Sequence, residues 1–243
     1  MAADGRRHVV AFGGLPGPDS PDAPLRPYLD YLAALTGRSR PRTAFLATAT
    51  GDDAASAERM RARLGETGHE LSQLALFPMP NVADPEDFLL SQDVIFVGGG
   101  SVANLAAVWR VHGLDRIMRQ AWASGIILTG VSAGAICWFE SGTTDSFGPD
   151  LRPFTAGLGL LAGSYCPHYD AEPQRRPLFS SLIATGALPP GIACDDAAGA
   201  HYTDGALTAV VSGRPGANGY RVEPDGAGGA THTPLPRRPL PGT

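Results

Sequence analysis

The sequence has only 3 cysteines among its 243 residues, and no two of them form a Cys-x-x-Cys pair. An odd number of widely separated thiols argues against a disulfide framework, and the missing paired motif argues against a zinc site. Cys137, Cys166 and Cys194 therefore fit reduced, structural thiols in a cytoplasmic protein.

An excess of positive charge is also missing, as is any long apolar run. The 24 acidic residues outnumber the 19 Lys and Arg, which gives a formal net charge of -5. This balance argues against a surface for nucleic acid or anionic membranes. The apolar stretch near the N-terminus is interrupted by Gly13 and Gly14 before it could serve as a signal peptide, and no segment is long enough to span a membrane. We therefore expect a small-molecule partner.

The hydrophobic content sets the expected size of the folded unit. Hydrophobic residues make up 43% of the chain, which is enough for one α/β domain of ordinary size. We expect a single domain over residues 1–224. Residues 225–243 are rich in Gly and Pro and have few side chains to bury, so we expect this tail to be disordered or loosely packed.

Short apolar runs alternate with amphipathic stretches through the first half of the chain. The pattern predicts strands at 8–12, 42–48, 70–77, 93–99 and 125–130, and helices at 25–37, 52–68 and 101–125. Such alternation indicates crossover units and a mostly parallel sheet with helices on both faces. Further along, the pattern predicts a helix at 174–186, a strand at 191–196 and a hairpin at Asp204-Gly205.

Residues 130–134 read Gly-Val-Ser-Ala-Gly and satisfy the G-x-S-x-G pattern between an apolar run and a helical pattern. A sharp turn at this point holds the Ser132 hydroxyl away from the backbone, and the small neighbours let a substrate approach. The amides that open the following helix face developing negative charge. The alternative, a tight turn with an incidental serine, does not explain the whole context.

A serine nucleophile needs a base to take its proton and a third group to orient that base. Of the six histidines, His168 follows a strand-like run, whereas His69 and His112 fall at polar positions and are predicted to face solvent. Asp195 and Asp196 end another predicted strand, where an acidic pair can equally be a turn former or helix cap. We favour His168 as the base and Asp196 over Asp195 as its partner.

Acyl transfer also needs amide donors for the oxyanion. Ala133, directly after the serine, can supply one, and the glycine run at 98–100 can supply another from Gly99 or Gly100. A phosphate-binding loop is the alternative for this run, but the Lys-Ser/Thr that should follow it is missing.

The segments FVGGGSVANL, GVSAGAICWFE, CPHYDAEPQRRPLF and DDAAGAHY, in this order and spacing, resemble the peptidase E family of serine peptidases. That family includes aspartyl dipeptidases and is related to cyanophycinases. The resemblance covers roughly residues 8–223. It implies a fold similar to class I glutamine amidotransferases, a flavodoxin-like three-layer sandwich, with serine in place of the cysteine nucleophile.

The resemblance also implies roles for particular residues. The nucleophile falls on Ser132, the base on His168 and the acid on Asp196, where relatives often have Glu. The oxyanion donors fall in the glycine run at 98–100. The chain departs from the family at Ser101-Val102, where relatives commonly have Asn-Thr.

Peptidase E enzymes prefer an N-terminal aspartate, which implies a cation in the substrate pocket. Arg175 and Arg176 follow His168 closely, and a guanidinium matches a carboxylate in bidentate fashion. Because the two are adjacent on a predicted helix, we expect only one of them to face the substrate. The alternative is a solvated arginine pair near a helix start.

The resulting hypothesis is a cytoplasmic serine dipeptidase that cleaves Asp-Xaa and needs no metal or organic cofactor. One alternative is an α/β-hydrolase-type esterase, in which the order Ser, acid, His would make His201 or His232 the base. Another is a catalytically silent relative that binds a ligand. The sequence leaves open whether isoaspartyl or cyanophycin-derived dipeptides are the substrates, and whether the protein is a homodimer.

Overall fold

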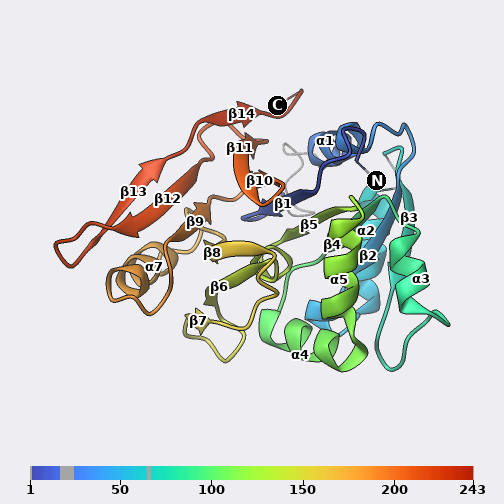
Figure 1. Cartoon of the computed structure of the whole chain (residues 1–243), viewed down its shortest axis with the longest axis horizontal. Helices are drawn as coiled ribbons and strands as arrows, with labels where there is room; N and C mark the ends of the chain where they lie inside the picture. Colours follow the sequence, from blue (N-terminus) through green and yellow to red (C-terminus); the bar gives the residue numbers. More distant parts are fainter. Residues whose placement is uncertain (1, 17–24, 65–66, 243) are drawn as a thin grey trace.

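A large sheet forms the centre of the molecule. The computed structural model describes residues 2–16, 25–64 and 67–242. Within these ranges the sheet has eight strands in the order β14-β11-β10-β1-β5-β4-β2-β3 (Figure 1). They are β1 (His8–Phe12), β2 (Arg42–Leu46), β3 (Glu70–Leu74), β4 (Val94–Val97), β5 (Ile127–Val131), β10 (Ala198–Thr203), β11 (Ala206–Ser212) and β14 (Arg237–Pro239).

The strands predicted in the first half of the chain form the parallel part of this sheet. β1, β5, β4, β2 and β3 are neighbours and run parallel. Every residue of β1 and β4 is buried, as expected for strands covered on both faces. β10 pairs antiparallel with β1 and continues into β11, which confirms the hairpin predicted at Asp204-Gly205. The carboxyl ends of β1, β4 and β5 therefore meet at one edge, where sites in such sheets form.

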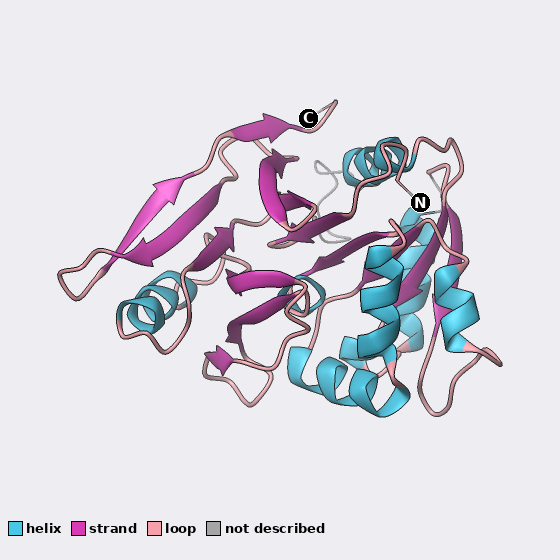
Figure 2. Cartoon of the chain, viewed as in Figure 1, coloured by secondary structure: helices cyan, strands magenta, loops and turns pink. Residues whose placement is uncertain are grey.

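Helices flank the large sheet in two groups, which confirms the predicted α/β class (Figure 2). α1 (Arg26–Thr36) contacts α2 (Ala54–Leu64), whereas α5 (Leu114–Ala123) contacts both α3 (Pro85–Leu90) and α4 (Val102–His112). A short 3-10 helix, η1 (Thr48–Thr50), follows β2. The single helix predicted at 101–125 is interrupted at Gly113, whose φ of 71° ends α4 and begins α5.

A smaller sheet, which the sequence pattern does not predict, lies beside the large one. Its strands in the described part of the chain are ordered β13-β12-β9-β8-β6-β7. Their bounds are β6 (Phe139–Thr144), β7 (Arg152–Phe154), β8 (Leu161–Cys166), β9 (Gly191–Cys194), β12 (Gly219–Pro224) and β13 (Ala230–Pro234). α7 (Arg175–Ala184) packs against this sheet, and Phe179 on α7 is fully buried between them. The ends of β8 and β9 lead to His168 and Asp196.

Residues 225–242, expected to be disordered or loosely packed, form two paired strands, although most of their side chains are exposed. β13 pairs antiparallel with β12, and β14 pairs parallel with β11. Leu240 is only 2% exposed, and its amide donates to the Ser212 carbonyl at 2.8 Å. Composition misleads here because strand pairing uses backbone groups that every residue except Pro possesses, so a tail with few apolar side chains can still extend two sheets.

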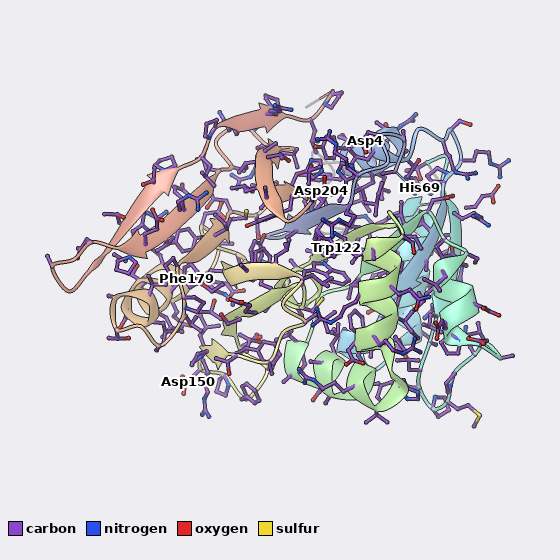
Figure 3. All side chains as sticks on the ribbon, viewed as in Figure 1. Asp4, His69, Trp122, Asp150, Phe179 and Asp204 are labelled. Atoms are coloured by element: carbon purple, nitrogen blue, oxygen red, sulfur yellow. The ribbon has the colours of Figure 1, made fainter. Side chains whose placement is uncertain are left out.

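Side-chain burial corrects the prediction for His69 and agrees with the prediction of structural cysteines. His69, predicted to face solvent, is buried; its Nδ1 lies 2.7 Å from Thr43 Oγ1 and its Nε2 lies 3.0 Å from the Leu29 carbonyl (Figure 3). The cysteines are free and buried, and burial raises the pKa of the Cys166 and Cys194 thiols to about 12. None of the described helices is long and apolar enough to cross a bilayer.

The paired tail leads to a prediction about stability. We expect Leu240→Ala to lower the free energy of unfolding by about 2–4 kcal/mol, because it removes a fully buried side chain from the core. Thr233→Ala, at an exposed position on β13, is the control and should change it by less than about 0.5 kcal/mol. Urea unfolding of the parent and both variants measures the difference, and equal midpoints would mean that the tail does not contribute to the folded core.

Candidate active site

Ser132 occupies a sharp turn between a strand and a helix. β5 ends at Val131, and the short helix α6 (Ala133–Ile136) begins directly after the serine. Ser132 has φ 55° and ψ -115°, a backbone conformation that L-residues other than glycine rarely adopt. Its amide donates to the Phe12 carbonyl at the end of β1, at 3.2 Å. The turn therefore presents the side chain at the carboxyl edge of the sheet.

The two glycines of the Gly-x-Ser-x-Gly segment are required by close backbone packing. A Cβ atom at Gly134 would lie 2.2 Å from the Val97 carbonyl oxygen at the end of β4. A Cβ atom at Gly130 would lie 2.2 Å from the Gly134 carbonyl oxygen. Backbone atoms cannot move away as a flexible side chain could, so only glycine fits at either position.

A histidine and an aspartate from the smaller sheet face this edge. His168 follows β8 and also has a left-handed backbone, with φ 52°. Its Nδ1 lies 2.7 Å from Asp196 Oδ1. The Asp196 amide donates to Asp170 Oδ1 at 2.8 Å, and Arg214 donates both to Asp170 and to the Asp196 carbonyl. These hydrogen bonds fix the backbone of Asp196 and so the position of the carboxylate that contacts the imidazole.

Asp195 lies apart from this pair. It is 3% exposed, and its Oδ2 accepts from the Asn218 amide at 2.9 Å. Burial raises the pKa of this carboxyl. Consecutive residues at a strand end point to opposite sides, so when Asp196 faces His168, Asp195 faces the interior next to β12. Of the two carboxylates, Asp196 therefore contacts the imidazole and Asp195 contacts the Asn218 amide.

Gly14 is a further part of the site, and its role was not recognised in the sequence. It forms a parallel bridge with Asp196, and its carbonyl accepts from the Ala197 amide at 2.9 Å. A Cβ atom at Gly14 would lie 2.0 Å from Asp196 Oδ1 and 3.0 Å from His168 Nδ1. The only signal was the Gly13-Gly14 pair directly after a predicted strand.

Ser132 and His168 line one cavity of about 360 Å³, together with Gly100, Ser101, Asp145, Ser146, Glu172 and Arg175. Within the described residues no hydrogen bond joins the serine hydroxyl to the imidazole. Catalytic hydrogen bonds are often long in unliganded enzymes and shorten with substrate. A hydroxyl, an imidazole and a carboxylate in this order can perform nucleophilic attack with base assistance.

Backbone amides next to the serine are free to donate. Gly99 is adjacent, since a Cβ atom there would lie 3.4 Å from Ser132 Cβ. The flanking amides of Gly98 and Ser101 donate to the Leu46 and Ala49 carbonyls. In the described part of the chain, the amides of Gly99 and Gly100 have no acceptor. Unpaired amides beside a hydroxyl suit an oxyanion.

The two candidate arginines lie in different surroundings. Arg175 is 2% exposed and lines the cavity that contains Ser132. Its Nε donates to Glu172 Oε2 at 2.8 Å, and its Nη1 donates to the Thr143 carbonyl at 2.7 Å. Arg176 is turned away, with its guanidinium carbon 4.7 Å from the Tyr169 ring centroid and 5.1 Å from that of Tyr220.

Both histidines of the esterase alternative are engaged elsewhere. His201 is buried on β10, with Nε2 2.9 Å from His8 Nδ1 and Nδ1 2.7 Å from the Tyr31 hydroxyl. Burial, followed by the nearby His8, lowers the pKa of His201 to about 4. His232 contacts Tyr169 and Ser180 through its two ring nitrogens. Neither ring has a nitrogen left for Ser132.

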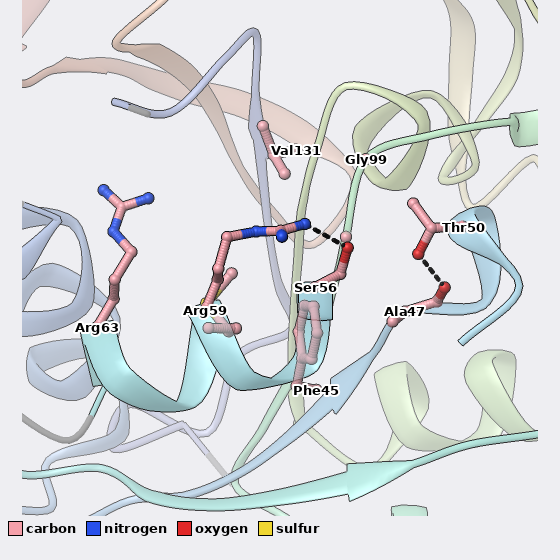
Figure 4. Close-up of a pocket in the computed structure, with 10 residues that line it drawn as sticks. Phe45, Ala47, Thr50, Ser56, Arg59, Arg63, Gly99 and Val131 are labelled. Atoms are coloured by element: carbon pink, nitrogen blue, oxygen red, sulfur yellow. Dashed lines mark hydrogen bonds between the residues drawn. The ribbon is translucent and has the colours of Figure 1, made fainter. Parts of the chain in front are cut away.

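Further cavities adjoin the first one and are not lined by Arg175. One, of about 370 Å³, shares Gly100, Ser132 and His168 with the first cavity and is also lined by Leu15, Pro16, Leu25, Met60, Arg63, Gly99 and Val131. The next shares Met60 and Arg63 with it and reaches Arg59 and Phe45 (Figure 4). The serine thus stands between a polar cavity and a largely apolar one.

Comparison with known proteins shows a match over most of the chain. The family model described as peptidase family S51 matches residues 20–210. The uncharacterized peptidase YgaJ of Bacillus subtilis (strain 168) is 42% identical over 216 residues, which are 89% of this chain and 92% of that protein.

Two solved structures share the fold. A putative peptidase E protein from Listeria monocytogenes EGD-e has a TM-score of 0.61 at 15% identity, covering 84% of this chain and 97% of that one. A peptidase from an acI-B1 Actinobacterium has a TM-score of 0.66 at 16% identity, covering 96% of each chain. At such identities the likeness concerns the fold alone.

The Asp196 geometry leads to a prediction about the acidic pair. We expect Asp196→Asn to lower kcat for peptide hydrolysis by about 10²- to 10⁴-fold, because the imidazole loses the carboxylate that fixes its tautomer and orientation. Gly14→Ala should reproduce much of this loss, since its methyl group displaces Asp196. Asp195→Asn is the matched control and should retain kcat within about threefold. Steady-state kinetics on the three variants measures these losses. A larger loss of kcat in Asp195→Asn than in Asp196→Asn would show that Asp195, not Asp196, orients the imidazole.

Proposed function

The chain belongs to peptidase family S51 and is a serine peptidase, and from this premise we propose that it hydrolyses dipeptides whose N-terminal residue is aspartate. Ser132 is the proposed nucleophile, His168 the general base and acid, and Asp196 the group that orients the imidazole. Two observations support these roles: Ser132 and His168 line one cavity, and His168 Nδ1 lies 2.7 Å from Asp196 Oδ1.

The proposed reaction follows the acyl-enzyme route. His168 Nε2 takes the hydroxyl proton as Ser132 Oγ attacks the peptide carbonyl carbon, and the carbonyl oxygen becomes an oxyanion facing the amides of Gly99, Gly100 and Ala133. The imidazolium then gives its proton to the leaving amine as the C–N bond breaks. Water, deprotonated by His168, then attacks the ester carbonyl carbon. The imidazolium returns its proton to Ser132 Oγ as the ester C–O bond breaks, and the carboxylate product leaves.

One observation carries the substrate proposal: the polar cavity beside Ser132 holds both a cation and carboxylates. Arg175, Glu172 and Asp145 all line it. An N-terminal aspartyl residue carries an α-ammonium group and a β-carboxylate, so its charges complement those of the cavity. A neutral or purely cationic N-terminal residue would match only half of them.

Arg175 has a donor left for the substrate carboxylate. Its Nε and Nη1 are occupied by Glu172 and Thr143, and among the described residues Nη2 has no partner. These bonds hold the guanidinium in one orientation, which lowers the entropic cost of binding. The Ser101 hydroxyl lines the same cavity and can donate a second hydrogen bond.

The nucleophile assignment leads to a prediction about activity. We expect Ser132→Ala to lower dipeptide hydrolysis by at least about 10³-fold while the protein stays folded, because the change removes one oxygen from a turn lined by small residues. Thermal unfolding of both proteins is the control for folding. A fluorophosphonate probe should label the parent and fail to label the variant. Turnover by the variant at the parent's rate would reject the serine.

The match between the charges of the cavity and those of an N-terminal aspartyl residue leads to a prediction about specificity. The parent should hydrolyse Asp-Leu about thirtyfold or more faster, in kcat/KM, than Asn-Leu or N-acetyl-Asp-Leu, because each analogue lacks one of the two charges that complement the cavity. Arg175→Met should shrink the Asp over Asn preference mainly by slowing Asp-Leu. Arg176→Met is the matched control, since that arginine stacks on Tyr169 outside the cavity.

Arg175 is buried, so folding needs its own check. Thermal unfolding identifies a destabilised variant, and the ratio of the two kcat/KM values does not depend on the fraction of folded enzyme. A parent without preference for Asp, or an unchanged preference in Arg175→Met, would remove aspartate from the proposal.

A further inference from the structure

A second cation lines another cavity that contains Ser132. Arg63, in the last turn of α2, lines the cavity that also contains Ser132, His168 and Gly99. This cavity does not include Arg175, which lines the polar cavity. The two arginines therefore line different cavities, and Ser132 lines both.

Arg63 differs from its neighbours on α2 in having no partner within the described residues. Arg61 pairs with Glu58 at 2.7 Å, and Arg59 donates to Ser56 Oγ at 2.9 Å. In Figure 4 the Arg59 guanidinium is directed to Ser56, whereas Arg63 is drawn without any such contact. Arg63 is half-buried, and burial lowers the pKa of its guanidinium.

A half-buried cation without a partner loses hydration and gains no compensating interaction. Arg175, by contrast, is compensated by Glu172 and the Thr143 carbonyl before any substrate arrives. An anion bound in the cavity would compensate Arg63. The remaining wall of this cavity is apolar, with Leu15, Pro16, Leu25 and Met60.

We propose that Arg63 binds the C-terminal carboxylate of the leaving amino acid, and that the apolar wall beside it contacts that residue's side chain. The inference rests on the proposed function, in which the N-terminal residue occupies the Arg175 cavity. A dipeptide spans Ser132 with its ammonium and β-carboxylate on one side and its α-carboxylate on the other. Arg63 then restricts the enzyme to substrates with one residue after the cleaved bond and favours an apolar residue there.

The test compares a free carboxylate with its neutral amide. Kinetics are measured on X-Leu, X-leucinamide and X-Leu-Gly, with X the best of Asp, Asn, Glu and Ala in the parent. The parent should prefer X-Leu over X-leucinamide by about ten- to a hundredfold in kcat/KM, the range for a hydrogen bond between charged groups. Arg63→Met should bring this ratio to within about threefold by slowing X-Leu alone, and Arg63→Lys should retain part of it.

Arg61→Met is the matched control, because it removes an exposed, ion-paired arginine from the same turn and should leave the ratio as in the parent. Equal rates on X-Leu and X-leucinamide in the parent, or an unchanged ratio in Arg63→Met, would overturn the proposal. An equal loss on both substrates would also overturn it, since a structural role slows both.

The two proposals fail separately in this design. Loss of the Asp over Asn preference, with the acid over amide ratio kept, removes the aspartate assignment and leaves Arg63. If no dipeptide is turned over, calorimetric titration of Ser132→Ala with Asp-Leu and Asp-leucinamide replaces kinetics. Tighter binding of the free acid, lost on adding Arg63→Met, supports the proposal, and equal binding of acid and amide, or none, overturns it.

Discussion

The close approach of two backbone segments at the end of β5 is the constraint on which the site depends. The turn at Ser132 packs so tightly against the end of β4 that side chains at Gly130 or Gly134 would overlap carbonyl oxygens. This packing holds the serine at φ 55° and brings it beside Gly99. A strained conformation persists only where its surroundings enforce it. Here the enforcing contacts are backbone on backbone, which leaves the turn little freedom to relax.

A second close approach joins the two sheets. Gly13 and Gly14 follow β1 of the large sheet, and a Cβ atom at Gly13 would lie 2.4 Å from the Cys194 carbonyl oxygen at the end of β9. The buried Tyr165 hydroxyl on β8 donates to the Ala11 carbonyl at 2.8 Å. Ser132 comes from the large sheet and His168 with Asp196 from the smaller one, so the position of the imidazole relative to the serine depends on this junction.

The sequence predicted those parts of the site that depend on residues close together in the chain. The Gly-x-Ser-x-Gly segment and the parallel strands carry their own patterns, because turns and buried strands need particular residues at short spacing. The smaller sheet, the buried environment of His69 and the pairing of β14 with β11 depend on partners far along the chain, which no local pattern encodes. β13 pairs with the preceding β12 in a hairpin, which the Gly- and Pro-rich composition of this segment concealed. Gly14 was visible as a glycine, but its proximity to Asp196 arises only when β1 and β9 meet. The same holds for Arg63, which reads as an ordinary cation in the last turn of a helix.

The charges along the cleft explain how an acidic chain can favour an acidic substrate. A net charge of -5 repels anions at long range, but salt screens that field over about 8–10 Å. Recognition therefore depends on charges at contact distance inside the cavities. Arg175, Asp145 and Glu172 line one cavity that contains Ser132, and Arg63 lines another. In the proposed binding mode, the ammonium group and the two carboxylates of an N-terminal aspartyl dipeptide meet charges of opposite sign in these cavities. In this mode Arg175, already paired in the free protein, orients a carboxylate, whereas Arg63, which has no partner among the described residues, gains one on binding. Orientation would thus come chiefly from the N-terminal side of the cleft and binding energy chiefly from the C-terminal side.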